Sequence, residues 1–177
     1  MTPKFTITIA TLVLAIFAGS ITAESQTDTD PARDFYRLTE ATQAAFKSGD
    51  HEKAQSLSAA LLVEAENWKQ SWNYGNAIHV ANLVLGRVAL AKGEMDDARK
   101  FLLAAGKTPG SPQLKSFGPD MVFAIEMLRK GEKDTVLQYF DLCEKFWDKR
   151  HSKLDEWRSA VSNNEEPNFG PNLRYFF

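Results

Sequence analysis

Apolar residues recur at spacings of three and four along almost the whole chain after residue 30, which is the pattern of amphipathic helices. Phe35, Leu38 and Ala41 follow this spacing in the first such segment. The alternating apolar and polar runs that predict β-strands are absent from the sequence. The pattern therefore predicts an all-α protein. We expect helices at about 31–47, 51–67, 70–92, 95–105, 119–130, 132–148 and 152–161, with the last two either separate or continuous.

The segment 106–121 interrupts this pattern, because it is rich in glycine and proline and is longer than a simple turn requires. A serine followed by a proline is typical of a helix start, so Ser111 and Pro112 predict one short helical turn inside the segment. Such a turn would let Leu114 and Phe117 pack inward. We interpret the segment as an elaborated connector between helices rather than as an active-site loop.

One glycine followed five positions later by a small apolar residue occurs three times, in the segments 45–57, 89–101 and 127–139. The glycines are 44 and 38 residues apart, a period that indicates stacked helix pairs. Each glycine is expected to end a helix with positive φ. Each small residue is expected to lie where the next helix crosses the first, because a large side chain there would hold the helices apart. The pairs are Gly49 and Ala54, Gly93 and Ala98, and Gly131 and Val136.

The middle repeat carries further residues at fixed spacing, namely Leu85, Gly86, Ala89, Gly93, Ala98, Leu102, Ala105 and Pro109. With these residues the chain resembles the tetratricopeptide repeat (TPR) family over about residues 34–147. It departs from the family at Asn82, where tryptophan is frequent, and at Ala89, where tyrosine is frequent. The resemblance implies a right-handed α-α superhelix of about three helix pairs, with a C-terminal capping helix and an irregular aromatic tail. A plain bundle of six or seven helices with coincidental glycines is the alternative.

The resemblance also implies where a partner would bind. Members of the family bind peptides or helices in a concave groove that the first helix of each pair lines. In this sequence the groove would have apolar walls and three basic residues, which favour an acidic segment or a carboxylate. Ordinary core packing and a solvated basic face are the alternative interpretation. The expected groove residues are Tyr36, Thr39, Gln43, Lys47, Val80, Leu83, Arg87, Met121, Ile125 and Arg129.

Motifs for catalysis, phosphate binding, dinucleotide binding and haem attachment are absent from the sequence. The three histidines lack the spacing of metal ligands, and Cys143 lies among apolar residues. We therefore predict no catalytic residue, no metal and no cofactor, and a protein that is not an enzyme. A second hypothesis is a small-ligand site or an enzyme site around residues 68–82, because amides beside aromatic rings can bind a small polar ligand. Its residues are Trp72, Asn73, Asn76 and His79.

The first 23 residues have the features of a cleavable secretory signal peptide. Lys4 supplies a positive start, residues 5–17 are mostly apolar, and small residues precede the expected cleavage after Ala23. A retained membrane anchor is the alternative. Cleavage predicts an exported protein of bacterial type, periplasmic or secreted, with no stable membrane insertion after the signal is removed.

After the signal we expect a flexible lead-in at 24–30, a TPR-like helical domain at 31–162 and a tail at 163–177. Because the tail ends in several aromatic residues, its exposure would promote aggregation, and we expect it to dock on the helices, with the groove as one candidate surface. The net charge of −2 argues against nucleic acid as a ligand. The expected partner is a protein or peptide, and a purely structural protein of the cell envelope is a third hypothesis.

Overall fold

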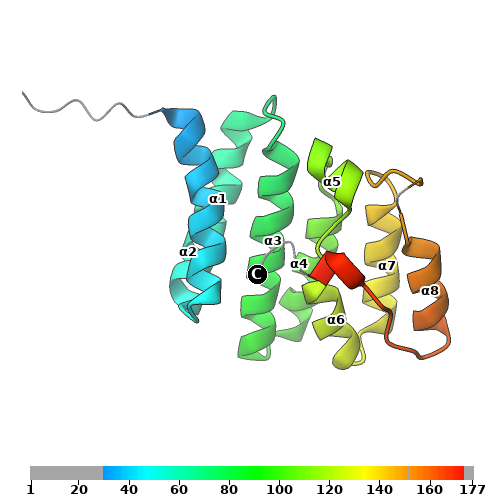
Figure 1. Ribbon diagram of the computed structural model, residues 1–177. Coiled ribbons are helices and arrows are strands. Elements are labelled where there is room, and N and C mark those ends of the chain that lie inside the picture. The colour runs from blue at the N-terminus through cyan, green and yellow to red at the C-terminus, as the bar shows by residue number, and fades with distance from the viewer. Residues whose placement is uncertain (1–29, 151, 174–177) are drawn as a thin grey trace, which may run out of the picture.

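The computed structural model describes residues 30–150 and 152–173, and within these ranges the chain forms eight α-helices, two short 3₁₀-helices and no strand (Figure 1). The prediction of an all-α protein is confirmed. The expected signal peptide and the residues of the lead-in before Asp30 lie outside the described residues. The elements are α1 (Pro31–Lys47), α2 (His51–Ala65), η1 (Glu66–Trp68), α3 (Tyr74–Lys92), α4 (Met95–Gly106), α5 (Pro112–Phe117), α6 (Val122–Arg129), α7 (Lys133–Cys143), α8 (Leu154–Ser162) and η2 (Gly170–Leu173).

The helices follow one another across the molecule, from α1 and α2 at the left of Figure 1 to α8 at the right. Helix α3 packs against both α2 and α4 and also contacts α1. Helix α4 packs against α7, which in turn contacts α6 and α8. After α8 the chain returns across α6 and ends in η2. The longest helix, α3, therefore lies between the N-terminal and the C-terminal helices.

The three repeat glycines end their helices as expected. Gly49, Gly93 and Gly131 have φ values of 80°, 80° and 84°, a region that residues with a Cβ rarely adopt. The three small residues that follow them are fully buried, as expected for positions where two helices cross closely. These residues are Ala54, Ala98 and Val136. The local part of the repeat prediction is thus confirmed.

Several helix boundaries differ from the prediction. Helix α3 begins at Tyr74 rather than near residue 70, because η1 and a turn precede it. Helix α6 begins at Val122 rather than at Pro119, with Met121 as its N-cap residue, and the Asp120 carboxylate before it accepts the Val122 N–H at 2.7 Å. Helix α7 ends at Cys143, well before residue 148, and α8 is a separate helix.

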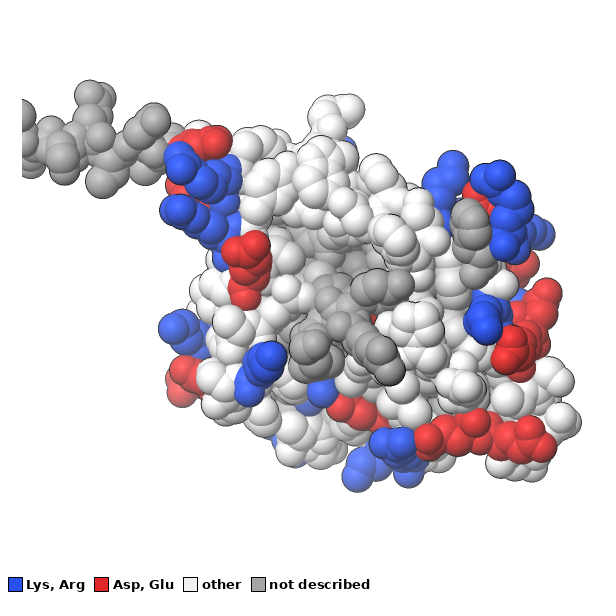
Figure 2. Space-filling model, in the orientation of Figure 1, with Lys and Arg blue, Asp and Glu red and all other residues white. Residues whose placement is uncertain are grey.

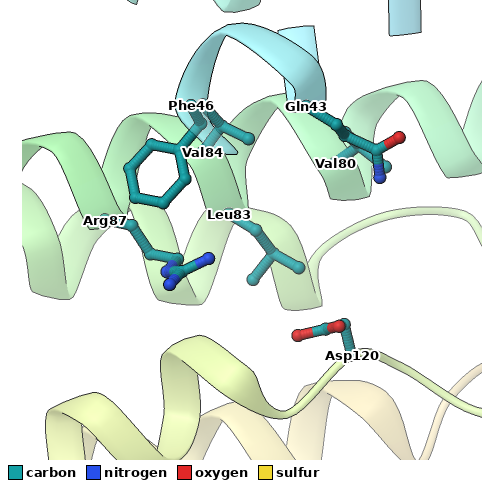
Figure 3. A pocket seen from close by; sticks show the side chains of 7 residues that line it. All are labelled: Gln43, Phe46, Val80, Leu83, Val84, Arg87 and Asp120. Carbon is teal, nitrogen blue, oxygen red and sulfur yellow. The ribbon is translucent and has the colours of Figure 1, made fainter. Parts of the chain in front are cut away.

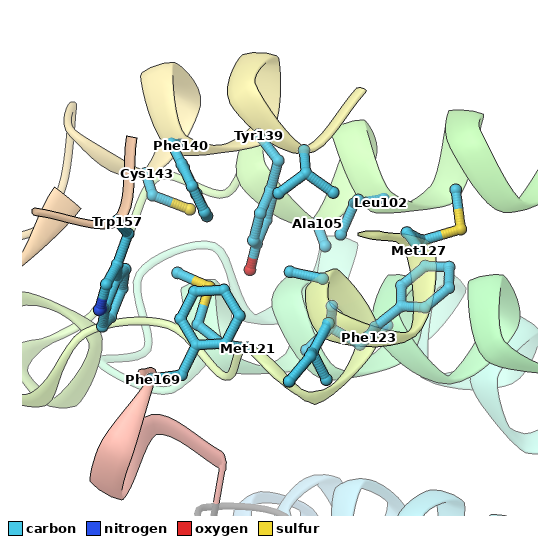
Figure 4. Packing of buried hydrophobic residues seen from close by; sticks show 14 of the residues in the cluster. Leu102, Ala105, Met121, Phe123, Met127, Tyr139, Phe140, Cys143, Trp157 and Phe169 are labelled. Carbon is cyan, nitrogen blue, oxygen red and sulfur yellow. The ribbon is translucent and has the colours of Figure 1, made fainter. Parts of the chain in front are cut away.

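The largest part of the hydrophobic core lies between α4, α6, α7 and α8 (Figure 4). Its aromatic centre is formed by Phe140 and Trp157 together with Phe169, a residue of the tail. The Phe169 ring lies edge-on to both, with ring centroids 6.1 Å from Phe140 and 4.8 Å from Trp157. The tail thus supplies one of the largest fully buried side chains of the protein.

Hydrogen bonds fix the described end of the tail to the connector between α5 and α6. The side-chain amide of Asn172 donates to the carbonyl oxygens of Phe117 at 3.0 Å and Pro119 at 2.8 Å. The backbone N–H of Met121 donates to the Asn172 carbonyl at 2.9 Å. Residues 163–173 therefore belong to the folded domain, and the last four residues of the sequence lie outside the described residues.

The connector contains the predicted short helix, α5. The Ser111 hydroxyl accepts the Leu114 N–H at 3.0 Å, and Leu114 is buried. The expectation that Phe117 also packs inward is wrong, because its side chain is 58% exposed. The indole ring of the buried Trp147 lies directly against Gly118, so the interior position next to Phe117 is already filled.

Candidate functional site

A cleft of about 450 Å³ opens between α1, α3 and α5. We call it the amide cleft, because three side-chain amides, Gln43, Asn73 and Asn76, lie along it beside a fourth, Gln113. On the face shown in Figure 2, the charged side chains of the described residues lie mostly around the edge. The residues that line the amide cleft are Thr39, Gln43, Asn73, Asn76, Val80, Gln113, Leu114, Phe117 and Gly118.

The polar wall of the amide cleft is held in place by hydrogen bonds between segments far apart in the sequence. The Asn76 side chain donates to Asn73 at 2.9 Å and to Gln113 at 3.2 Å, and it accepts from the Ser111 hydroxyl at 2.5 Å. At the residue before Asn76, the Gly75 carbonyl accepts a hydrogen bond from the Thr108 hydroxyl at 2.7 Å. The connector is thereby fixed to the start of α3, and the amides are preorganised rather than free to rotate.

A second hollow continues from the amide cleft, since Gln43 and Val80 line both. We call it the Arg87 pocket. Its walls are mainly apolar side chains of α1 and α3, with one cation and one acid toward the connector (Figure 3). The residues that line it are Gln43, Phe46, Val80, Leu83, Val84, Arg87 and Asp120.

Among the described residues, Glu126 and Phe46 hold Arg87 in place. Its guanidinium donates to both carboxylate oxygens of Glu126 on α6, at 2.8 and 2.7 Å, and lies 4.4 Å from the centre of the Phe46 ring. Only 15% of its side chain is exposed. This bidentate ion pair connects α3 to α6. Arg87 therefore both lines the pocket and contributes a positive charge to it.

Sequence reasoning missed Phe46, Val84 and Gln113 as site residues, and it also missed Asp120, the acid of the site. Asp120 is 2% exposed, and while its Oδ1 atom accepts the Val122 N–H, its buried Oδ2 atom has no hydrogen-bond partner among the described residues. Burial raises the pKa of its carboxyl from 3.8 to about 7. A buried oxygen without a partner is costly and marks a position where a donor from a ligand would be favourable. The only signal in the sequence is an acid directly after Gly118-Pro119, which reads equally well as a helix start.

His79, a member of the alternative patch, lies in the interior and does not reach the amide cleft. Its Nδ1 atom is 3.1 Å from the Ala105 carbonyl, and its Nε2 atom accepts the Asp120 N–H at 3.4 Å. Burial lowers the pKa of the imidazole from 6.5 to about 4, so at neutral pH it is uncharged and Nδ1 carries the proton given to Ala105. His79 therefore connects α3 to α4 and to the start of α6.

The predicted site residues divide into two groups. Half of the predicted groove residues meet at these two hollows: Thr39, Gln43, Val80, Leu83 and Arg87. Asn73 and Asn76 of the alternative patch line the same cleft. Two hypotheses that the sequence keeps apart thus concern one continuous surface.

The other predicted groove residues lie elsewhere. Met121 is fully buried and Ile125 nearly so, because this part of the chain packs on α7 and the tail rather than facing outward. Arg129 donates to Glu166 at 2.9 and 2.8 Å and lines a different hollow near α8. For these three residues, placement in the groove is corrected.

Three further predicted residues lie at the surface but line neither hollow. Tyr36 stacks on Trp72, with ring centroids 5.4 Å apart, and Trp72 is 53% exposed. Lys47, at the end of α1, is exposed. The Tyr36–Trp72 stack is close to the cleft in sequence, because Trp72 precedes Asn73 directly.

The described residues show no cluster suited to a metal ion and no helix long and apolar enough to cross a bilayer. Cys143 is buried, and burial raises the pKa of its thiol, which favours the protonated and unreactive form. No protein-family model matches the chain, and no curated protein or solved structure shows significant similarity to it. The resemblance to the TPR family therefore stays a prediction.

The pKa values of Asp120 and His79 predict opposite effects of pH on stability. The folded state holds an extra proton on Asp120 between pH 3.8 and about 7, so this group lowers stability as pH rises through that range. The unfolded state holds an extra proton on His79 between about pH 4 and 6.5, so this group raises stability over nearly the same range. The two groups therefore act against each other in the native protein.

The variant Asp120→Asn should show the pH dependence of stability that His79 alone causes. The substitution removes the titrating acid and keeps a side-chain oxygen that can accept the Val122 N–H. We expect its free energy of unfolding to rise by about 3 kcal/mol between pH 4 and 6.5, while that of the native protein changes much less. Urea unfolding at a series of pH values measures both. Equal slopes in the two proteins would show that Asp120 does not titrate in this range.

Proposed function

We propose that this protein is an exported, TPR-like helical repeat that binds a peptide or protein segment along the amide cleft and the Arg87 pocket. The observation that carries the proposal is the meeting, at one surface, of residues from α1 and α3, the first helices of the first two predicted pairs. In the proposed superhelix α1, α3 and α6 are the first helices of successive pairs, and α3 contacts both of the others. The sequence features of export and the three repeats support the same proposal.

The chemistry of the surface suits an extended peptide. Side-chain amides such as Asn76 and Gln113 offer both donors and acceptors, which a peptide backbone needs along its length. The apolar side chains of Val80, Leu83 and Val84 bound a pocket of only about 20 Å³, so they offer contact surface to an apolar side chain that lies in the adjoining cleft. Among the described residues, none that lines the amide cleft is charged, which argues against a partner held there mainly by charge.

Gln43→Trp tests the proposal, because Gln43 lines both hollows and a larger ring there would fill the passage between them. Peptides selected from a random library on the native protein should bind the variant at least about tenfold more weakly, a loss of about 1.4 kcal/mol. Isothermal titration of the selected peptides measures the change. Ala44→Trp is the matched control, because it adds the same ring on the exposed side of α1. Selection of no peptide above background, or equal binding by the two variants, would contradict the proposal.

A small polar ligand, such as a sugar, is the second candidate for the same surface. The exposed Tyr36–Trp72 stack beside the amide of Asn73 supports it, since sugars bind between aromatic faces and amides. The same titrations with oligosaccharides separate the two candidates. A sugar ligand should depend on Trp72→Ala, whereas a peptide in the Arg87 pocket should not.

A further inference from the structure

We propose that the last four residues of the sequence, Arg174 to Phe177, bind to their own molecule where the Arg87 pocket meets the amide cleft, and thereby compete with an external peptide for this surface. The proposal rests on the proposed function, in that it names an occupant that competes with the external peptide. It stands on three observations: where the described chain ends, how far four residues reach, and what the pocket is made of.

The described chain ends at the rim of the site. Asn172 is bonded to the carbonyls of Phe117 and Pro119 and to the N–H of Met121. These residues flank Asp120, which lines the Arg87 pocket, and Phe117 lines the amide cleft. In Figure 1 the red end of the described chain lies between α5 and α6. The tail is therefore delivered to the junction of the two hollows by buried, specific hydrogen bonds.

The reach of the segment limits its choice of surface. Four extended residues span at most about 13–14 Å. From Leu173, which follows the anchored Asn172, this length is enough to reach the residues that line the Arg87 pocket, because one of them, Asp120, directly precedes Met121, to which Asn172 is bonded. It is too short to cross the molecule to a distant face.

The pocket and the segment have matching chemistry. Three of the four residues are aromatic, and the pocket offers apolar walls from Phe46, Val80, Leu83 and Val84. The buried Oδ2 atom of Asp120 has no hydrogen-bond partner among the described residues. Arg174 and Tyr175 carry side-chain N–H and O–H donors that suit such an oxygen. A second copy of the chain or a foreign peptide could offer similar groups, but neither is delivered to this place by the fold.

Occupation from within the same chain has a functional consequence. A tethered segment acts at an effective concentration in the millimolar range, so an external peptide must displace it. The apparent affinity for the external peptide is reduced by the fraction of molecules in which the pocket is free. A weakly binding peptide would then not displace the tail, whereas a tightly binding partner, or a partner that removes the tail, would bind.

Methyl NMR of two proteins tests the proposal: the full chain, and a chain that stops after Leu173 and so keeps Phe169 and Asn172. Ring currents from a bound tail should shift the methyl signals of Val80, Leu83 and Val84 between the two proteins, and leave Leu102 and Val136 in the core unchanged. The shifts should not depend on protein concentration. Alanine at Tyr175, Phe176 and Phe177 together should reproduce the truncated spectrum at full length. Unchanged pocket methyls would overturn the proposal, and concentration-dependent shifts would assign the pocket to a second copy instead.

Peptide binding separates this proposal from the proposed function. A library peptide should bind the truncated chain about tenfold more tightly than the full chain. Equal affinities together with unchanged methyl signals would overturn the tail proposal and leave peptide binding intact. Shifted pocket methyls without any bound library peptide in the truncated chain would support the tail proposal and contradict the proposed function.

Discussion

Replacing Phe169 by alanine is expected to lower the free energy of unfolding by about 3–5 kcal/mol, the usual range for a large aromatic residue deleted from a core. Phe169 is 1% exposed and lies between Phe140 and Trp157, so its removal leaves a cavity among rings that cannot close around it. The Trp157 indole also donates to the Asn168 carbonyl at 3.1 Å, and this bond would weaken as the tail loosens. Chemical unfolding followed by circular dichroism measures the change.

Phe117→Ala is the matched control, because both phenylalanines precede a glycine and a proline in the sequence. Phe117 is 58% exposed, so the same deletion there should cost less than about 1 kcal/mol. Equal losses at the two positions, or a loss below about 1 kcal/mol at Phe169, would show that the tail contributes little to the core. The residue type and the following Gly-Pro are the same at both positions, so the comparison reports mainly the difference in burial.

Replacing Gly75 by alanine is expected to destabilise the protein by about 3 kcal/mol, at the upper end of overpacking effects. A Cβ atom at Gly75 would lie 1.7 Å from the Gly110 carbonyl oxygen, a backbone atom that cannot rotate away. The connector would have to move, and the bonds from Thr108 to the Gly75 carbonyl and from Asn76 to Gln113 would be strained or lost. The amide cleft should change with it, so peptide affinity should fall together with stability.

Gly49→Ala provides the comparison for Gly75→Ala. A Cβ at Gly49 meets no atom within 4 Å, but the residue has a φ of +80°. The free energy of unfolding should fall only by the roughly 1–2 kcal/mol that alanine costs in the left-handed region. Peptide affinity should not change. Urea unfolding and titration of both variants test this difference. A smaller loss at Gly75 than at Gly49 would mean that the connector can shift without cost.

Sequence reasoning succeeded where the determinant is local. The φ values of Gly49, Gly93 and Gly131 follow from a requirement within one turn of chain, and the pattern at those positions contains it. The Ser111 cap of α5 is local in the same way. Such features depend on neighbours in the sequence and need no knowledge of the tertiary packing.

Sequence reasoning failed where a distant segment decides. Met121 was expected to line a groove, but the bond between its N–H and Asn172, some fifty residues later, fixes this part of the chain in the core. The hydrogen bonds that join Asn76 to Ser111 and Gln113 also connect residues far apart in the sequence. In each of these bonds, the sequence around one residue does not indicate which distant residue it will contact. For the same reason, the sequence kept the amide patch and the predicted groove as separate sites.

The burial of Cys143 has a consequence for the chemistry of the protein in an oxidising compartment, such as the one proposed for it. Its thiol is fully buried in the main core, so oxidants cannot reach it in the folded state. Burial also raises the pKa of the thiol, which disfavours the reactive thiolate. Oxidants and other thiols can react with it only after this region opens. An oxidised Cys143 would therefore show that this region had opened, and intermolecular disulfides would form only from molecules that had lost their native packing.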